Sequence, residues 1–91
     1  MSGAPKSRDD VTFVELDGEA VVYDELRGAV HHLNVSATIV WSLCDGDTSL
    51  DEMSRTIAEA FDLNVDDVRP QVSEVLDVFG RAGLLAAPVP A

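Results

Sequence analysis

The residues best suited to chemistry gather in one short stretch, "AVHHLNVSATIVWSLCDG", which runs from Ala29 to Gly46. Two adjacent histidines, His31 and His32, precede Cys44, which is the only cysteine of the chain. A cysteine beside a histidine can act as a nucleophile with its base, and a group of His, Cys and Asp side chains can bind a metal ion. The stretch is therefore either an active site or a surface with another role.

The spacing argues against catalysis and against a metal. Residues 29–33 are typical of a strand, and neighbouring strand residues point to opposite faces, so His31 and His32 cannot easily share one ion or one substrate atom. Cys44 falls on a different expected element, with no cationic residue beside it to lower its pKa. A lone cysteine on an apolar helix face is usually a small buried hydrophobic residue. We therefore expect no catalytic residues, no metal site and no cofactor.

An acidic stretch, "DGDTSLDE" from Asp45 to Glu52, has the oxygen-rich composition of a calcium loop. It lacks the D-x-D-x-D-G spacing and the distal Glu that such a loop needs. A turn at Gly46 followed by a capping box of Ser49 and Glu52 explains the same residues without a metal. No phosphate loop, nucleophile elbow or zinc spacing occurs in the chain. These observations predict that the protein is not an enzyme.

Length and charge restrict the possible partners. The chain has 91 residues, enough for one small domain, and 17 acidic against 6 basic residues give a net charge of −11. So few Lys and Arg residues cannot form the basic face that binding of nucleic acid requires. No apolar run reaches the roughly 18–20 residues that span a bilayer, and the N-terminus does not resemble a signal peptide. We expect a cytoplasmic protein with neither nucleic acid nor membrane as a partner.

The first half of the ordered chain has the period of β-strands. Apolar residues alternate over Val11–Leu16, and two further short β-rich runs follow at Glu19–Tyr23 and Ala29–Leu33. Asp17-Gly18 is a strong signal for a two-residue hairpin, and a longer turn ends at Gly28. Short links between three strands predict an antiparallel meander, which needs cover on one face to be stable.

Three helices are expected to supply that cover. Asn34 is a good N-cap for a helix over Val35–Cys44, in which Trp41 and Cys44 face the core. Ser49 and Glu52 start a second helix over Leu50–Phe61.

The third helix should begin near Asp66 or Asp67, because Pro70 is tolerated best in a first turn. Gly83 fits a left-handed cap at its end. Its expected buried face consists of Val68, Val72, Val75, Leu76 and Phe79.

The resulting order predicts an α+β fold of winged helix-turn-helix-like type, with a three-stranded antiparallel N-terminal sheet followed by three helices. We expect the folded domain over residues 11–85, a flexible N-terminal arm over residues 1–10 and a flexible C-terminal tail over residues 86–91. The chain contains no internal repeats.

Two surface features favour the binding of a peptide. The third strand is an edge of the expected sheet and carries none of the Lys, Pro or bulge signals that usually guard an edge. The third helix has a wide apolar arc, which Val78 and Ala82 extend on one flank. The other flank carries small or flexible side chains beside Leu76, those of Arg69, Ser73 and Gly80. Such an edge beside an apolar helix suits an extended peptide that adds as a strand. The sequence leaves open which flank would line the groove.

The segment from Asp17 to Leu85 resembles the PqqD-like peptide chaperones, also described as RiPP recognition elements. The most specific features are the Leu33-Asn34 pair, Trp41, the "DG" of Asp45-Gly46 and the closing Gly83-Leu84-Leu85. Several spaced features that agree in order make the resemblance more specific than any one of them.

The resemblance implies a winged-helix-like fold that binds the leader segment of a ribosomally made precursor peptide. The leader would dock as an added strand along the third strand, in a groove against the third helix. The domain would then present the precursor to a peptide-modifying enzyme such as a radical SAM enzyme, a cyclodehydratase or a protease, without doing chemistry itself.

Carried onto this chain, the resemblance places the peptide-binding residues on the third strand and the third helix. They are Ala29, Val30, His31, His32, Leu33, Arg69, Val72, Ser73, Val75, Leu76 and Phe79. We expect a monomer or a weak dimer.

Two other functions remain as alternatives at this stage. A winged-helix regulator that binds DNA would fit the fold type, but the net charge and the sparse basic residues of the third helix, Arg69 and Arg81, oppose it. A small thiol enzyme would need a reactive Cys44.

Overall fold

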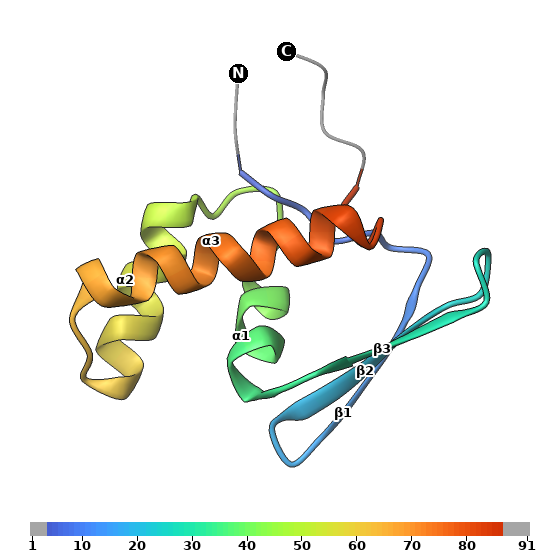
Figure 1. The fold of residues 1–91 in the computed structure, drawn as a ribbon, viewed down its shortest axis with the longest axis horizontal. Helices are drawn as coiled ribbons and strands as arrows, with labels where there is room; N and C mark the ends of the chain where they lie inside the picture. Colours follow the sequence, from blue (N-terminus) through green and yellow to red (C-terminus); the bar gives the residue numbers. More distant parts are fainter. Residues whose placement is uncertain (1–3, 87–91) are drawn as a thin grey trace.

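The computed structural model describes residues 4–86 as three antiparallel strands followed by three helices. Figure 1 shows α3 lying across α1 and α2, with the sheet extending to one side of them. This order confirms the α+β architecture that the sequence predicts. The elements are β1 (Thr12–Leu16), β2 (Glu19–Asp24), β3 (Ala29–Leu33), α1 (Val35–Leu43), α2 (Leu50–Phe61) and α3 (Val65–Arg81).

The sheet is a simple meander in the order β1-β2-β3, so β1 and β3 are both edges. Asp17 and Gly18 join β1 to β2 with φ angles of 57° and 84°. Two successive positive φ values are those of a type I′ hairpin turn, whose twist matches that of the strands it connects. The two-residue hairpin expected from the sequence is confirmed, and it sets the register in which Leu16 pairs with Glu19.

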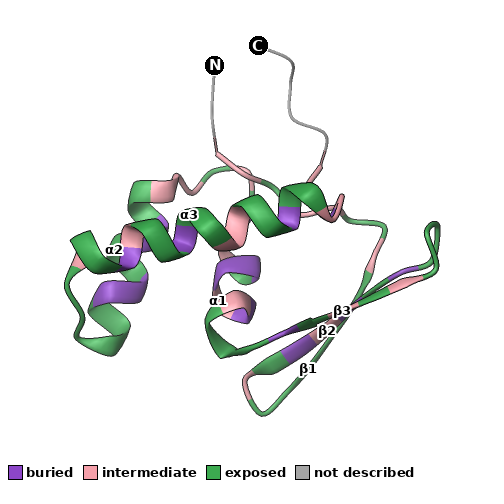
Figure 2. Cartoon of the chain, viewed as in Figure 1, coloured by how far each residue is buried: buried purple, intermediate pink, exposed green. Residues whose placement is uncertain are grey.

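The register decides which side chains share a face of the sheet. Phe13 and His31 lie opposite Val22 on either side, so all three point the same way. Val22 has an exposed fraction of 0%, which identifies this face as the one toward the helices. Of the sheet residues, mainly those of β2 are buried (Figure 2).

Local sequence signals start the first two helices. The N–H of Ala37 donates to the side chain of Asn34 at 2.9 Å, which confirms Asn34 as the cap of α1. Ser49 and Glu52 form both hydrogen bonds of a capping box at the start of α2. The expected boundaries of these helices are correct to within one residue, because each boundary is encoded by neighbours in the chain.

The expected start of α3 is wrong by one or two residues. Asn64 caps the helix through the N–H of Asp66 at 2.8 Å, so the helix begins at Val65. Pro70 is consequently beyond the first turn, where it removes one backbone hydrogen bond. Pro70 and Asp66 are both exposed, so water can reach the carbonyl group that this bond would have satisfied. The helix thus starts at the cap that Asn64 supplies and accommodates Pro70 in its second turn.

The end of α3 follows the expected pattern. Gly83 has a φ of 74°. The N–H of Leu84 donates to Phe79 O at 2.9 Å and that of Gly83 donates to Gly80 O at 3.1 Å. This pair of bonds defines a Schellman motif, which requires the left-handed conformation that glycine adopts easily. A Cβ atom at Gly83 would also overlap the guanidinium group of Arg27.

An aromatic cluster links the sheet to the helices. Phe13 of β1 stacks on Trp41 of α1 with ring centroids 6.2 Å apart, and Trp41 meets the edge of Phe79 of α3 at 5.5 Å. Trp41 and Cys44 are buried, as the sequence predicts. The buried hydrophobic residues around them are Ala20, Val22, Leu33, Val40, Met53, Ile57, Ala58, Val68, Val72, Phe79 and Leu84.

The segment before β1 is tied to the helices by backbone hydrogen bonds. Ser7 N donates to Cys44 O and Arg8 N donates to Leu84 O, each at 2.9 Å. Pro5 O accepts from the N–H of Gly46, also at 2.9 Å. These residues belong to the arm that the sequence predicts as flexible, and in the structure they join the ends of α1 and α3. Residues 1–3 and 87–91 lie outside the described part of the chain.

We predict that Phe79→Ala destabilises the fold strongly. Phe79 is 1% exposed and holds the edge of Trp41, so its removal leaves a cavity between α1 and α3. The free energy of unfolding in urea should fall by about 3–5 kcal/mol. Phe61→Ala, at a position that is 48% exposed, is the matched control and should change it by less than about 1 kcal/mol. Equal losses in the two variants would contradict the role given to Phe79.

Candidate functional site

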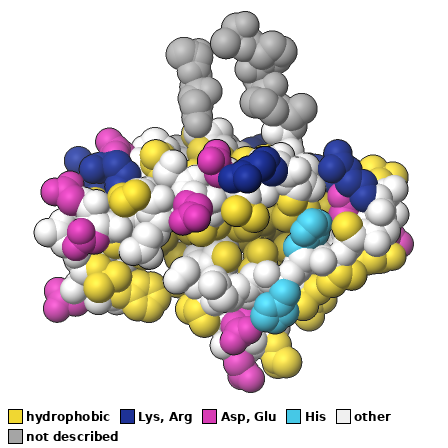
Figure 3. All heavy atoms as spheres, viewed as in Figure 1, with side chains coloured by type: hydrophobic (Ala, Val, Ile, Leu, Met, Phe, Trp, Pro, Cys, Tyr) yellow, Lys and Arg dark blue, Asp and Glu magenta, His cyan; other side chains and the backbone are white. Residues whose placement is uncertain are grey.

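A hollow separates α3 from β3 on the face of the molecule shown in Figure 3. No Cα atom of α3 lies within 8 Å of a Cα atom of β3, so these two elements do not pack directly. Hydrophobic side chains form the floor of the hollow, and both His side chains, which come from β3, are visible beside it (Figure 3). The free edge of β3 and a hydrophobic groove therefore lie next to each other.

The aromatic cluster of Phe13, Trp41 and Phe79 explains how the groove stays open. The three rings pack in a row and fill the space between the backbone of the sheet and that of α3. Phe13 remains 37% exposed, whereas Trp41 and Phe79 are buried at 8% and 1%. Sequence reasoning assigned Trp41 to the core and did not give Phe13 a role at the groove, although its place in the strand alternation puts it on the correct face.

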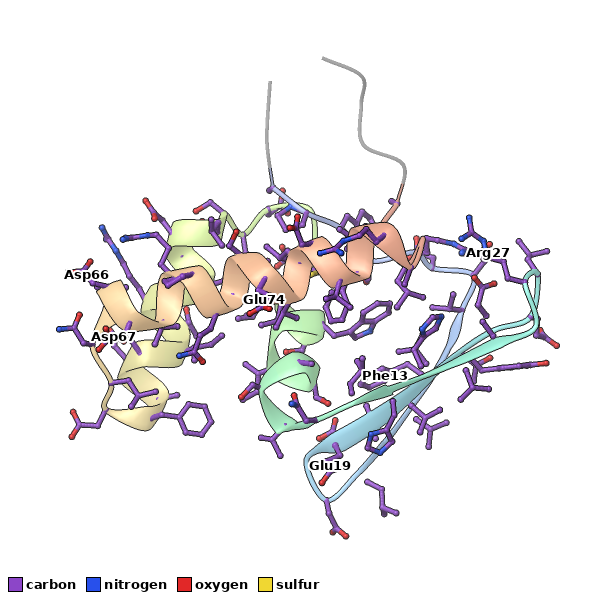
Figure 4. All side chains as sticks on the ribbon, in the orientation of Figure 1. Phe13, Glu19, Arg27, Asp66, Asp67 and Glu74 are labelled. Atoms are coloured by element: carbon purple, nitrogen blue, oxygen red, sulfur yellow. The ribbon has the colours of Figure 1, made fainter. Side chains whose placement is uncertain are left out.

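The two flanks of α3 have different surroundings. Arg69 Nε is 2.9 Å from a carboxylate oxygen of Asp51 on α2, so this flank, which also carries Ser73 one turn later, faces α2. Figure 4 shows Glu74 on the front of α3, on the side toward α1. Val78, one turn after Glu74, shares that side and is 53% exposed. The flank of Glu74 and Val78 is therefore the one open to the groove.

The two histidines lie on opposite faces of β3, as the strand alternation predicts. His32 pairs with Val21 and is directed outward, with its Nε2 3.4 Å from a carboxylate oxygen of Glu19. His31 is half-buried on the inner face, and its Nε2 is buried without a hydrogen-bond partner. The two rings cannot act together on one ion or one substrate.

The structure brings only some of the expected peptide-binding residues to the groove. Ala29 and His31 belong to the inner face of β3, while Val75 and Leu76 are half-buried on α3. Val30 and His32 are exposed on the outer face, and Arg69 and Ser73 are on the flank toward α2. Three of the residues are core residues with exposed fractions of 4%, 2% and 1%: Leu33, Val72 and Phe79.

Sequence reasoning missed a charged cluster that lies between the β2–β3 turn and the end of α3. The carboxylate of Asp24 has an exposed fraction of 0% and accepts from Arg8 Nη1 at 2.8 Å. The same guanidinium group donates to Gly83 O at 3.0 Å, and Arg27 lies 3.9 Å from Asp24. Burial acts to raise the pKa of Asp24, but the hydrogen bond and charge of Arg8, with a smaller effect of Arg27, lower it overall. The cluster fixes β2 and the end of α3 to the segment before β1.

Neither Cys44 nor the acidic turn offers reactive chemistry. Cys44 is 3% exposed, and burial, with a smaller effect from Asp45, raises the pKa of its thiol to about 12. Asp45 accepts from the N–H groups of Asp47 and Thr48 at 2.8 and 2.9 Å and from the Thr48 hydroxyl at 3.1 Å. These bonds, chiefly that from Asp47, lower the pKa of Asp45. The turn interpretation of this stretch is confirmed.

Within residues 4–86, no group of three or more His, Cys, Asp or Glu side chains is placed to hold a metal ion. No helix in the same range is long and apolar enough to span a bilayer.

Comparison with known proteins identifies the family. Residues 19–85 match the family model described as coenzyme PQQ synthesis protein D, PqqD. The chain belongs to the PqqD family. This confirms the resemblance first seen in Leu33-Asn34, Trp41 and Gly83-Leu84-Leu85. No curated protein matches the chain.

Two solved structures share the fold of this PqqD family member. One is TbiB1 in complex with the TbiA(beta) leader peptide, at 20% sequence identity and a TM-score of 0.80, covering 93% of this chain and 99% of that one. The other is a lasso peptide synthetase B1 complexed with its leader peptide, at 13% identity and a TM-score of 0.80, covering 93% and 100% of the two chains. At these identities the likeness establishes the common architecture.

We predict that Cys44 reacts slowly with iodoacetamide at pH 8 in the folded protein. A shift of the thiol pKa from 9.0 to about 12 reduces the thiolate fraction on the order of a thousandfold. The rate in the folded state should therefore be far below the rate in guanidinium chloride, where the thiol is exposed. Comparable rates in the two states would support a reactive thiol and contradict the buried position.

We also predict that the Arg8–Asp24 pair stabilises the fold above about pH 4 and loses its effect in acid. The folded-state pKa of Asp24 lies below its ordinary value of 3.8, so protonation on acidification favours the unfolded state. Asp24→Asn should lower the thermal midpoint at pH 7, and its difference from the unmodified protein should shrink as the pH approaches 2. Asp9→Asn, at a side chain that is 89% exposed, serves as the control. A difference for Asp24→Asn that is independent of pH would contradict this account.

Proposed function

We propose that this protein is a non-catalytic chaperone that recognises the leader segment of a ribosomally made precursor peptide and delivers it to a modifying enzyme. The observation that carries the proposal is the free edge of β3 beside a hydrophobic groove under α3. An edge strand presents unpaired N–H and C=O groups, which an extended peptide can satisfy by adding as a strand.

The groove explains how side chains of the leader would contribute. Alternate residues of an added strand point to the inner face, where they would lie against the aromatic floor and the open flank of α3. On that flank Val75 is half-buried and Val78 is exposed, so both offer apolar surface to a ligand. Main-chain bonds would supply affinity, and the groove would select the residues that enter it.

β3 is better suited to this role than β1, the other edge. α1 packs against β2 and β3, and β3 continues directly into α1 through Asn34. No helix has a Cα atom within 8 Å of β1. A peptide on β3 would therefore lie closer to the backbone of α1 than a peptide on β1.

The relatives of known structure support the same proposal. TbiB1 and the lasso peptide synthetase B1 were each solved with a leader peptide, and this chain shares their fold. The proposal extends leader recognition to this chain and includes a peptide-modifying enzyme as its second partner. The buried, protonated thiol of Cys44 supports a role without chemistry.

A DNA-binding function finds no support in the structure. Arg69, one of the two arginines of α3, is engaged by Asp51 and Asp66, and the chain carries a net charge of −11. The other, Arg81, lies 3.8 Å from Asp77, so both basic side chains of this helix have acidic neighbours that oppose phosphate contacts.

The direct test is chemical-shift mapping of the 15N-labelled protein with synthetic leader peptides, beginning with the TbiA(beta) leader. We expect saturable shifts in residues 29–33 of β3 and along the open flank of α3. Shifts that are absent at high peptide concentration, or that are confined to β1, would refute the proposed site.

The two flanks of α3 offer a matched pair of variants. Val78→Glu places a carboxylate on the open flank and should weaken leader binding by about tenfold or more, because the charge would be desolvated against the peptide. Ser73→Glu adds the same charge on the flank toward α2 and should leave the dissociation constant within about twofold. Both positions are exposed, so both variants should fold. The reverse order of effects, measured by isothermal titration, would place the groove on the other flank.

A further inference from the structure

Two side chains of opposite charge stand at different places along the groove, and the proposed function gives neither of them a role. Arg27 belongs to the turn between β2 and β3, and Glu74 belongs to α3, one turn before Val78. Both residues are exposed. Figure 4 shows Arg27 at the end of α3 and Glu74 near the middle of that helix. A peptide in the groove would therefore meet a basic residue at one place and an acidic residue at another.

The side chain of Arg27 crosses the end of the groove. Arg27 comes two residues before β3 begins, and its Nη1 donates to Ala82 O, at the end of α3, at 3.4 Å. The side chain thus reaches from one wall of the groove to the other, and it is 60% exposed. The one carboxylate of residues 4–86 within 4 Å of it, that of Asp24 at 3.9 Å, already accepts from Arg8 at 2.8 Å. Most N–H groups of the Arg27 guanidinium can therefore bind a carboxylate of a ligand.

The carboxylate of Glu74 carries an unpaired charge at the rim of the groove. Glu74 belongs to none of the ion pairs among residues 4–86, whereas Asp66 and Asp77 of the same helix each have an arginine partner. Figure 4, which has the orientation of Figure 3, shows Glu74 on the front of α3, above the hollow. A basic side chain of a bound peptide would find its counter-charge there.

The direction of β3 determines the order in which a leader would meet the two charges. β3 begins at Ala29, beside Arg27, and ends at Leu33, which leads into α1. Both strand pairs of the sheet are antiparallel, and antiparallel pairing is slightly more stable than parallel pairing. A leader that adds antiparallel to β3 would run from the α1 end of the groove toward Arg27. Its residue beside Glu74 would then precede, in the leader sequence, its residue beside Arg27.

We propose that Glu74 and Arg27 set the direction and register of the leader, Glu74 by pairing with a basic residue and Arg27 by pairing with an acidic residue that follows it. This inference rests on the proposed function, since it requires a peptide on the edge of β3. Each contact is weak by itself because both side chains are exposed. Together they favour one placement of the peptide, because any other placement loses an attraction or opposes like charges.

The test uses a phage-displayed library of random peptides, selected separately on four forms of the full chain. These are the unmodified protein, Glu74→Lys, Arg27→Gln and Glu59→Lys. Glu59→Lys is the matched control, because it makes the same change of charge at an exposed position of α2. No Cα atom of α2 lies within 8 Å of a Cα atom of the strands, so this control lies away from the groove.

The selected pools should differ in their charged positions. Pools from the unmodified protein and from Glu59→Lys should carry Lys or Arg at one position and Asp or Glu at a later one. On Glu74→Lys the first position should change to Asp or Glu, because the attraction has become a repulsion. On Arg27→Gln the preference at the later position should disappear, while that at the first position remains.

A peptide from the first pool supplies a quantitative measurement on the unmodified protein. Exchanging its basic and acidic residues turns two attractions into two repulsions, so binding should weaken by about tenfold. The exchange leaves the net charge of the peptide unchanged, so general attraction to the acidic protein cannot cause this difference. In about 1 M salt the two peptides should bind within about twofold of each other, because the Debye length falls to about 3 Å.

The outcomes separate this inference from the function on which it rests. If the exchanged peptide binds β3 as tightly as the original, the role of the two charges is wrong and the peptide-binding function stands. This comparison needs only the unmodified protein, so it decides the question whether or not Arg27→Gln folds. Equal changes in the Glu74→Lys and Glu59→Lys pools would show an effect of net charge and would also overturn the role. An acidic residue before the basic one would contradict the antiparallel direction. If no selected peptide shifts the resonances of β3 or α3, both proposals fail.

Discussion

The packing of three aromatic rings holds the sheet and the last helix at a fixed separation, and the rest of the architecture depends on it. Phe13, Trp41 and Phe79 come from β1, α1 and α3, and they meet at centroid distances of 6.2 and 5.5 Å. The backbones of α3 and of the three strands do not approach each other closely, so side chains fill the space between them. Large rigid rings suit this position, since they bury much area with little loss of rotamer freedom.

This separation between the sheet and α3 creates the groove. With the aromatic rings in place, the edge of β3 lies free beside an apolar floor. At the hairpin end, Arg8 links Asp24 to Gly83 O and fixes β2 relative to α3. The groove is thus held by packing at its floor and by a charged cluster at its end. A preformed site of this kind costs a bound peptide less ordering of the protein than a site that must assemble.

Local signals explain why the sequence predicts most of the fold. Asp17-Gly18, Asn34, the Ser49–Glu52 pair and Gly83 each satisfy backbone groups next to them in the chain, so their effects can be recognised without knowledge of the tertiary structure. The expected start of α3 was too late because it was placed from Pro70 alone. The structure starts the helix at Val65, directly after the cap that Asn64 supplies. The family resemblance rests on the same kind of spaced local features, and the family match agrees with it.

The site was less predictable because it depends on contacts between distant residues. Strand alternation correctly separates His31 from His32, yet only the packed structure shows that His31 Nε2 is buried and unpaired. The ion pair of Arg69 with Asp51 identifies the flank of α3 that faces α2, and the groove lies on the other flank. The helical pattern of the sequence does not contain this information.

The attachment of the N-terminal segment through Arg8 and Asp24 likewise joins residues far apart in sequence.

The central claim, that a leader peptide becomes a fourth strand on β3, is tested most directly by intermolecular NOEs between labelled protein and unlabelled leader. The account predicts backbone-to-backbone NOEs from the peptide to residues 29–33 and side-chain NOEs to Val78. NOEs to β1, or to side chains alone with no backbone contacts, would contradict it.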